Sequence, residues 1–406
     1  MTINRTFSSS SLAGLSILAF SLTAFSAPAV ADPFSSLSEA SVSGNLRYRY
    51  EFVEDGNLTR DNANAGTLRA RITFTGAEVN GFSTGLEFDY VSALRDDFDS
   101  TANGNTTQSV VADVEGTNIN QLYIKYSGSA GDFILGNQRI NLGTQRYVGG
   151  VGFRQQEQTF DALTYNYKSD SFSLSYSYVD EVNRIFQSSA TSRIAETFDS
   201  ESHFVRLNAG DLNAYIYALD FENGAAASSI TYGLDYKLSL SDLTLTGSIA
   251  TQSDYGDNPV SYDALYYSLV GAYKIDTTTL NFGYEVMGSD DGDANFATPL
   301  ATLHKWAGWA DVFLLGSAVS NGALINGLED AYIGVAGSTS GISWGVTYHD
   351  FSSNEGGISY GTEIDAIAGY KFADNISGEI KYANYSADDP GTVDTEKLWL
   401  TLSVSL

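Results

Sequence analysis

The chain has 406 residues, no cysteine and a formal net charge of −28 at neutral pH. This negative charge argues against nucleic acid or anionic lipid as a partner, and the absence of cysteine excludes a disulfide scaffold and a thiolate metal site. After the first 31 residues the sequence has almost no helical periodicity, and no apolar run approaches the ~20 residues of a membrane helix. If this chain crosses a membrane, it must therefore do so as a closed barrel of strands.

Residues 1–31 are predicted to be a cleaved secretory signal peptide. Arg5 and the α-amine supply positive charge, residues 12–22 form a short apolar core, and Ala29-Val30-Ala31 is a small-x-small cleavage site. The apolar core is too short to span a bilayer. We therefore expect an exported protein whose mature part, residues 32–406, forms one all-β domain.

Apolar and polar residues alternate along most of the mature chain. In residues 172–178, phenylalanine, leucine and tyrosine alternate with serine, and the same pattern recurs at 46–52, 68–74, 86–90, 230–236, 280–286 and 342–348. Such alternation is typical of a strand with one apolar and one polar face. Because the apolar face is rich in Tyr, Phe and Trp near the strand ends, as in an aromatic girdle, we expect that face to contact lipid and the polar face to line a lumen.

The alternation predicts a transmembrane antiparallel β-barrel of 18 strands. They are placed at residues 42–53, 67–76, 83–92, 118–127, 132–138, 159–168, 171–179, 202–209, 213–219, 229–237, 242–250, 263–273, 279–287, 328–336, 341–349, 362–370, 375–384 and 397–406. Every second connection is short, and the intervening ones are longer and acidic, as periplasmic turns and extracellular loops are. The final strand alternates up to Leu406 and resembles the assembly signal of outer-membrane barrels.

Two of the long connections, residues 139–158 and 288–327, stand out by their length. Long loops that contain glycine can fold into a barrel lumen and narrow it. The alternative is that both are disordered surface loops. The sequence leaves this choice open.

The arginines are concentrated in the first half of the chain, where all 12 that follow the signal peptide lie at or before Arg206. Arg47 and Arg49 fall on the polar face of the first predicted strand, and Arg69 and Arg71 fall on that of the second. With a lumen inside, four guanidinium groups would point into it from adjacent strands.

The third predicted strand adds Glu87 and Asp89 on its polar face, and Lys125 on the fourth strand completes the predicted pore lining. If strand pairing keeps the apolar faces together, Arg71 lies opposite Asp89 and Thr73 lies opposite Glu87. One interpretation is a charged constriction that attracts anions or screens dipolar solutes. The other is a set of cross-strand ion pairs that brace the barrel wall.

Signs of catalysis or metal binding are weak. None of the three histidines, His203, His304 and His349, has a partner at metal-ligand spacing, and no nucleophile elbow, Walker A or Rossmann motif is present. His304 and Asp311 could share a loop site, although a lone loop histidine is more often solvated. Acidic pairs in the outer loops could hold Ca²⁺ or Mg²⁺, but no EF-hand spacing is complete, and solvated loop charge is the favoured interpretation.

Several segments are similar to the alginate export family of outer-membrane porins. They are residues 136–161, 299–314, 328–332, 348–351 and 360–365. The resemblance implies an 18-stranded barrel with passive passage through an arginine-lined constriction. The candidates for that lining in this chain are Arg47, Arg49, Arg69, Arg71, Arg139 and Arg154.

We therefore predict a channel without enzymatic activity or cofactor, in the outer membrane of a Gram-negative bacterium. It would pass small or oligomeric hydrophilic solutes, with anionic sugars such as alginate-type uronates as candidates. The expected partners are these solutes, outer-membrane lipid and lipopolysaccharide, and the barrel assembly machinery. An alternative is a barrel plugged by residues 139–158 and 288–327 that serves as a structural or surface-binding protein. An outer-membrane hydrolase would need a Ser/His/acid constellation that the sequence does not supply.

Overall fold

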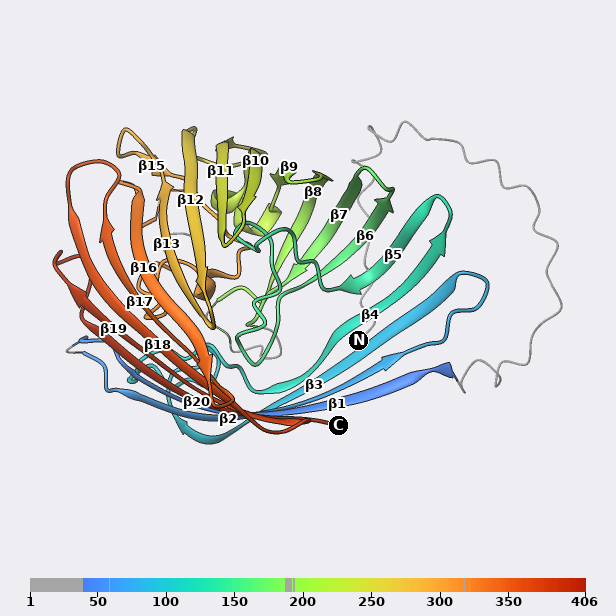
Figure 1. Ribbon diagram of the computed structural model, residues 1–406, viewed down its shortest axis with the longest axis horizontal. Coiled ribbons are helices and arrows are strands. Elements are labelled where there is room, and N and C mark those ends of the chain that lie inside the picture. The colour runs from blue at the N-terminus through green and yellow to red at the C-terminus, as the bar shows by residue number, and fades with distance from the viewer. Residues whose placement is uncertain are drawn as a thin grey trace, which may run out of the picture.

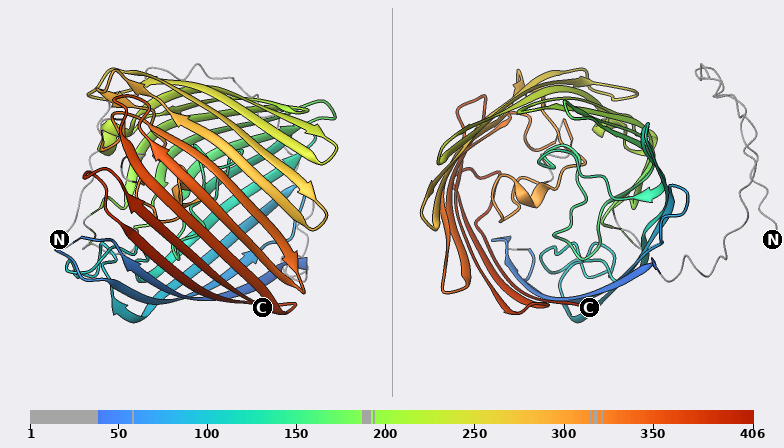
Figure 2. Two further views of the ribbon diagram at one scale, coloured as in Figure 1. Left: turned by 60° about the vertical axis from the view of Figure 1, so that its left-hand side comes forward. Right: turned by 45° about the vertical axis from the view of Figure 1, so that its right-hand side comes forward.

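The computed structural model describes residues 39–57, 59–186, 192, 194–314, 316, 319–320 and 322–406. The predicted signal peptide, residues 1–31, lies outside the described residues. The described chain forms a closed ring of tilted strands that surrounds two long loops (Figure 1, Figure 2). No helix in the described part of the chain is long and apolar enough to cross a membrane.

Eighteen antiparallel strands form the barrel, as predicted. They are β1 (Ser41–Glu54), β2 (Ala63–Thr75), β3 (Phe82–Asp97), β4 (Gly116–Gly128), β5 (Gly131–Gln138), β6 (Thr159–Lys168), β7 (Ser173–Asn183), β8 (Thr197–Ala209), β9 (Leu212–Leu219), β10 (Ser229–Leu240), β11 (Leu243–Asp254), β12 (Asp263–Ile275), β13 (Thr278–Met287), β16 (Leu328–Thr339), β17 (Ile342–Ser352), β18 (Ser359–Ala373), β19 (Ile376–Ala387) and β20 (Thr395–Ser405). Each pairs with its neighbours in chain order, and β20 pairs with β1 to close the ring. Closure leaves no unpaired sheet edge, which is the condition for strands to cross a bilayer.

The apolar faces of the strands point outward, as predicted. Ile72, Leu122 and Leu234 are 57%, 53% and 47% exposed, whereas Arg49 and Arg69 on the opposite face are 3% and 5% exposed. A soluble protein would bury these aliphatic side chains, so their outward direction is the arrangement of a barrel surrounded by lipid.

The short connections are tight turns at one end of the barrel. Asn80 and Gly81 both have positive φ, at 53° and 84°, and join β2 to β3. Ser340 and Gly341, at 50° and 81°, join β16 to β17 in the same way. Two successive residues with positive φ make the turn whose twist matches that of paired strands.

Several strands are longer at their outer ends than the sequence predicts. β8 begins at Thr197 rather than 202, and β7 ends at Asn183 rather than 179. A register shift between Val179 and Glu181 breaks the alternation at this place. Beyond it the outward face of β8 carries the exposed acids Asp199 and Glu201, and the buried face carries Phe198. The apolar-outward alternation that marks a lipid-facing strand is therefore lost there.

Two connections lie inside the ring of strands. They are residues 139–158, here called inner loop A, and residues 288–327, here called inner loop B (Figure 2). Inner loop A starts from β5 and returns to β6, which have only 8 and 10 residues. Inner loop B joins β13 to β16 and contains the two-residue strands β14 (Ser289–Asp290) and β15 (Ala294–Asn295) and the short helix η3 (Leu303–Lys305). A second short helix, η2 (Glu222–Ala227), lies between β9 and β10.

The main hydrophobic core of the described chain lies within the lumen. Inner loop B contributes Phe296 and Leu300, and inner loop A contributes Val148, all fully buried. They belong to one cluster with Tyr217 and Tyr266 on the lumen face of the wall. The two inner loops are thus packed against the barrel by apolar contacts and do not hang free in it.

Candidate functional site

Two arginines stand directly opposite each other on β1 and β2. Arg47 is the register partner of Arg69, while Arg49 lies opposite Thr67 and Arg71 lies opposite Asn45. All four arginines lie on the strand faces opposite the exposed apolar side chains of β1 and β2, such as Leu46 and Ile72. Like charges directly opposite each other across a strand pair are unfavourable by roughly 0.2–1 kcal/mol. The groups that surround them must therefore compensate for this repulsion.

The predicted register between β2 and β3 is confirmed. Arg71 is opposite Asp89, and Thr73 is opposite Glu87. The Arg71 guanidinium donates to both Asp89 oxygens, from Nε at 2.6 Å and from Nη2 at 2.5 Å. The Thr73 hydroxyl donates to Glu87 at 2.6 Å. A bidentate arginine–carboxylate pair of this kind fixes the orientation of both groups.

Inner loop A extends this network through Glu157. One Glu157 oxygen accepts from Arg71 Nη1 at 2.8 Å, and the other accepts from Arg139 Nε at 2.5 Å. Arg139 also donates to Glu87 at 2.6 Å. Burial opposes ionisation of Glu157, but the guanidinium groups of Arg71 and Arg139 outweigh it and lower the pKa of its carboxyl to about 2. Glu157 is therefore charged at neutral pH.

Arg47 and Arg49 hold inner loop A by its backbone. Arg47 donates to the carbonyl oxygens of Gly152, at 3.0 Å, and Arg154, and Arg49 donates to that of Phe153 at 2.5 Å. The Arg49 guanidinium also lies 4.1 Å from the centre of the Phe153 ring. In the described part of the chain, no carboxylate forms an ion pair with Arg47 or Arg49. Both cations are thus held in place while their charge stays unneutralised by a direct partner.

The Arg69 guanidinium is only partly hydrogen-bonded. Its Nη2 donates to Asn45 at 2.9 Å, and its Nη1 lies 3.9 Å from Glu157. Neither Nε nor Nη1 of Arg69 has a hydrogen-bond partner among the described residues. Buried guanidinium N–H groups without an acceptor are unfavourable, and an anionic solute or water would satisfy them.

Arg154 joins the wall to both inner loops. It belongs to inner loop A, its Nη1 donates to Glu51 of β1 at 2.9 Å, and its Nη2 lies 3.5 Å from Asp311 of inner loop B. Eight of the nine predicted lining residues therefore lie in one connected region: Arg47, Arg49, Arg69, Arg71, Arg139, Arg154, Glu87 and Asp89. Lys125 lies apart from it, near the turn between β4 and β5, and pairs with Asp132 at 2.8 Å.

The predicted association of His304 with Asp311 is present, and His304 is not solvated. Its Nδ1 lies 2.7 Å from Asp311, its ring stacks on Phe153 at 3.6 Å between centres, and its Nε2 lies 2.9 Å from the Lys381 ammonium. His304 is 6% exposed. Burial lowers the pKa of His304 to about 3 despite the opposing charge of Asp311, so the ring is neutral at pH 7.

The sequence did not identify the groups that hold the tip of inner loop B. Lys397 of β20 donates to Asp311 at 2.8 Å. Glu363 and Asp365 of β18 accept from the backbone amides of Ala310 and Trp309, at 2.7 and 3.2 Å. Strand alternation places both acids on the lumen face, but it cannot show that a loop 50 residues away reaches them.

The two inner loops are also hydrogen-bonded to each other. The Gly149 amide donates to the Leu300 carbonyl at 2.9 Å, the Thr302 amide donates to Gln145 at 3.1 Å, and the Lys305 ammonium donates to Thr144 at 3.1 Å. They therefore form one unit inside the barrel. Among the described residues, no group of three or more His, Cys, Asp or Glu could hold a metal ion.

Residues 38–306 match the sequence profile of the family described as Alginate export. The chain belongs to the alginate export family. Three solved structures share the fold of this family member: OccAB4 of Acinetobacter baumannii, OccK9 (OpdG) of Pseudomonas aeruginosa and the outer-membrane protein OpdK of P. aeruginosa. Their identities to it are 14%, 16% and 14%, each with a TM-score of 0.66 over 91% of this chain and 98%, 99% and 99% of theirs. A comparison with curated protein sequences found no match.

Membership of the alginate export family, together with a closed barrel whose outer face is apolar, places the protein in the outer membrane of a Gram-negative bacterium. Its family and fold are those of outer-membrane porins and export channels, which are not enzymes. The barrel wall of this alginate export family member contacts membrane lipid.

Proposed function

We propose that this barrel is a passive diffusion channel for small or oligomeric hydrophilic solutes, with a preference for anions such as uronate-type sugars. The arginines of β1 and β2, together with Arg139 and Arg154, would line its constriction. An 18-stranded barrel is wide enough for an aqueous lumen, and cations on its wall raise the local concentration of anions.

The direct pairing of Arg47 with Arg69 is the observation that carries this proposal. A wall that needed only bracing would pair each arginine with a carboxylate, as Arg71 is paired with Asp89. Here two cations face each other across strands, and Arg69 keeps donors without a partner. Such an arrangement is unfavourable for folding, and it suits a site that anions visit.

Recordings from single barrels in planar bilayers test the proposal. We expect ohmic conductance and, in a salt gradient, a reversal potential of the sign that marks anion preference. A barrel with verified insertion and no conductance would contradict the channel. Conductance with cation preference would contradict the role of the arginines.

The packing of inner loop B supports a second candidate, a plugged barrel with a structural or surface-binding role. Phe296, Leu300 and Phe313 are buried in the lumen, in a core that a freely open pore would lack. Deletion of residues 306–318 separates the two candidates. If conductance appears only after the deletion, the loop is a plug; if the intact chain already conducts, it is a constriction.

We also propose that the barrel assembly machinery inserts this chain, and that lipopolysaccharide surrounds its outer half. The support is the amphipathic final strand β20, which pairs with β1 to close the barrel. Both partners are expected for any barrel of this kind. Crosslinking of β20 to the barrel assembly machinery during assembly would test the first of these two proposed partners.

A further inference from the structure

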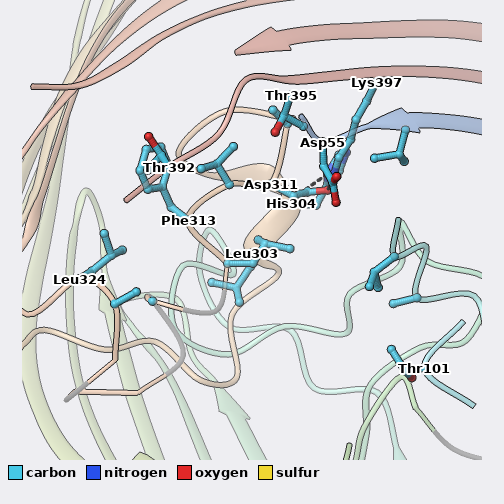
Figure 3. A pocket seen from close by; sticks show the side chains of 18 of the residues that line it. Asp55, Thr101, Leu303, His304, Asp311, Phe313, Leu324, Thr392, Thr395 and Lys397 are labelled. Carbon is cyan, nitrogen blue, oxygen red and sulfur yellow. Dashed lines mark hydrogen bonds and ion pairs between the residues drawn. The ribbon is translucent and has the colours of Figure 1, made fainter. Parts of the chain in front are cut away.

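The connection between β3 and β4, residues 98–115, is packed against the inside of the barrel and is here called the β3–β4 loop. Its Phe98 and Val111 are buried in a small hydrophobic cluster with side chains of β1 and β2. Its Thr101 lines a cavity of about 700 Å³ whose opposite side includes Lys397 of β20 (Figure 3). The β3–β4 loop is therefore part of the lumen wall, and it carries residue 113 to the arginines.

Asp113 of the β3–β4 loop is a fully buried acid, 0% exposed. Its Oδ1 accepts from the backbone amide of Gln155 at 3.0 Å, and its Oδ2 accepts from the Thr67 hydroxyl at 3.2 Å. In the part of the chain that the structure describes, no lysine or arginine forms an ion pair with Asp113. Burying a carboxylate beside neutral donors alone is unfavourable, so an acid is a poor choice if this position only braces the wall.

Two further hydrogen bonds connect Asp113 to Arg47. Gln155 of inner loop A donates from Nε2 to the Thr67 hydroxyl oxygen at 2.9 Å, and its Oε1 accepts from Arg47 Nε at 2.9 Å. Thr67 and Gln155 are 1% and 0% exposed, so water does not compete for these bonds. A buried polar chain thus runs from Asp113 through Thr67 on β2 and Gln155 to Arg47 on β1.

The carboxylate at one end of this chain sets the direction of every hydrogen bond in it. A carboxylate only accepts, so the single hydroxyl proton of Thr67 points to Asp113. The Thr67 oxygen must then accept from the Gln155 NH₂ group, and this leaves the Gln155 amide oxygen facing Arg47 Nε. An asparagine at position 113 could donate to Thr67 and let the whole chain reverse, which would turn the Gln155 NH₂ group toward the Arg47 N–H.

We propose that Asp113 is a positioning residue for anion passage, which fixes the Arg47 guanidinium in the lumen through Thr67 and Gln155. The inference rests on the proposed function and deepens it, because it places a determinant of anion preference outside the constriction. The other Arg47 donors bind backbone carbonyls, so Nε is the donor whose acceptor a reversal would remove. Arg47 lies directly opposite Arg69, and without that acceptor the repulsion between the two cations would move Arg47 away.

The sign of the effect separates positioning from charge. By its charge alone, an acid near the arginines weakens the attraction of anions, so Asp113→Asn would raise the chloride-to-potassium permeability ratio. We expect Asp113→Asn to lower this ratio by about 1.5-fold or more, measured as the reversal potential in a KCl gradient. Asp97→Asn, the same change at an exposed residue that ends β3, is the matched control. A raised ratio in Asp113→Asn would overturn the proposal.

Variants of Thr67 test the same chain without a change of charge. Thr67→Val removes the hydroxyl and is expected to lower the permeability ratio as Asp113→Asn does, whereas Thr67→Ser restores the hydroxyl and the ratio. Thr67→Val also keeps the proposal testable if Asp113→Asn does not fold. An unchanged ratio in Thr67→Val would overturn the proposal.

A double variant tests whether Asp113 acts through Arg47. In the Arg47→Gln background, Asp113→Asn is expected to have no further effect on the permeability ratio, because the guanidinium that it positions is absent. An equal effect of Asp113→Asn in both backgrounds would show that Asp113 acts independently of Arg47 and would overturn the proposal.

Nuclear magnetic resonance of the arginine Nε–H groups in detergent needs no conducting pore, so the two proposals fail separately. The Arg47 signal is assigned by its absence in Arg47→Gln. We expect its exchange with water to be at least about tenfold faster in Asp113→Asn than in the unaltered barrel, because its buried acceptor is lost. Faster exchange without conductance in any variant would contradict the channel and leave the positioning role standing. Conductance with unchanged Arg47 exchange would leave the channel and overturn the positioning role.

Discussion

At the scale of single residues, the lumen contains cations in two different situations. Arg71 is matched to Asp89 and Glu157 by short, charge-assisted hydrogen bonds. Arg47 and Arg49 are instead held by carbonyl groups of inner loop A. The first arrangement stabilises the wall and neutralises charge. The second fixes the position of a cation and leaves its field available to a solute.

Charge reversal at Arg69 tests the electrostatic role of this region. Arg69→Glu is expected to lower the chloride-to-potassium permeability ratio by about twofold or more, because it replaces a lumen cation by an anion. The measurement is the reversal potential in a KCl gradient. Arg95→Glu is the control, since Arg95 is an exposed arginine at the outer end of β3 that pairs with Asp97. An equal shift in both variants would contradict a special role of Arg69.

The buried ring of His304 predicts an acid-sensitive loop. Its pKa is lowered by burial to about 3, beside Asp311, Lys381 and Arg154, and its ordinary value is about 6.5. Its contribution to stability is therefore complete above pH 6.5 and is lost at about 1.4 kcal/mol per pH unit as the pH falls toward 3. We expect faster hydrogen exchange of the 304–311 amides at pH 4.5 than at pH 7, after correction for the intrinsic rate. In His304→Gln this pH effect should disappear; its persistence would show that another group titrates.

At the scale of elements, the sequence predicted the strands well and their loop contacts poorly. Each strand between lipid and lumen alternates strictly, so its face and its register could be inferred, as for Arg71 and Asp89. Glu157 and Lys397 could not be assigned partners in this way. Their partners come from loops whose path is set by packing inside the barrel, and no short-range pattern records that packing.

Gly308 tests how the wall holds inner loop B. It has a φ of +77°, and a Cβ there would lie 2.4 Å from the Glu363 carboxylate, so Gly308→Ala should displace the carboxylate that accepts from Ala310. We expect hydrogen exchange at the Trp309 and Ala310 amides to accelerate tenfold or more, which corresponds to about 1.4 kcal/mol. Gly104→Ala is the control, because Gly104 has a φ of +74° and no atom within 4 Å of the added Cβ. Unchanged exchange in Gly308→Ala would contradict the anchoring role of β18.

At the scale of the whole molecule, the fold follows from one requirement, which is that every strand in a bilayer has a hydrogen-bonded neighbour on both sides. Eighteen strands with an apolar outer face pair in chain order and close through β20 and β1, so that every strand has two neighbours. The strand number and the closed form could be predicted because alternation and the short and long connections repeat along the chain. The contacts inside the barrel could not be predicted, because the two inner loops join distant parts of the wall, from Glu51 on β1 to Glu363 on β18.

The most direct test of the account is which face of a strand meets lipid. Spin labels on Leu174→Cys, Ser175→Cys and Tyr176→Cys, one at a time in β7 of barrels in lipid vesicles, can be probed by collision with oxygen and with a water-soluble nickel chelate. The account predicts that the labels at 174 and 176 respond to oxygen from the lipid, while the label at 175 responds to the chelate. Access of the chelate to 174 and 176, with a lipid-exposed label at 175, would contradict a water-filled interior and the transport function built on it.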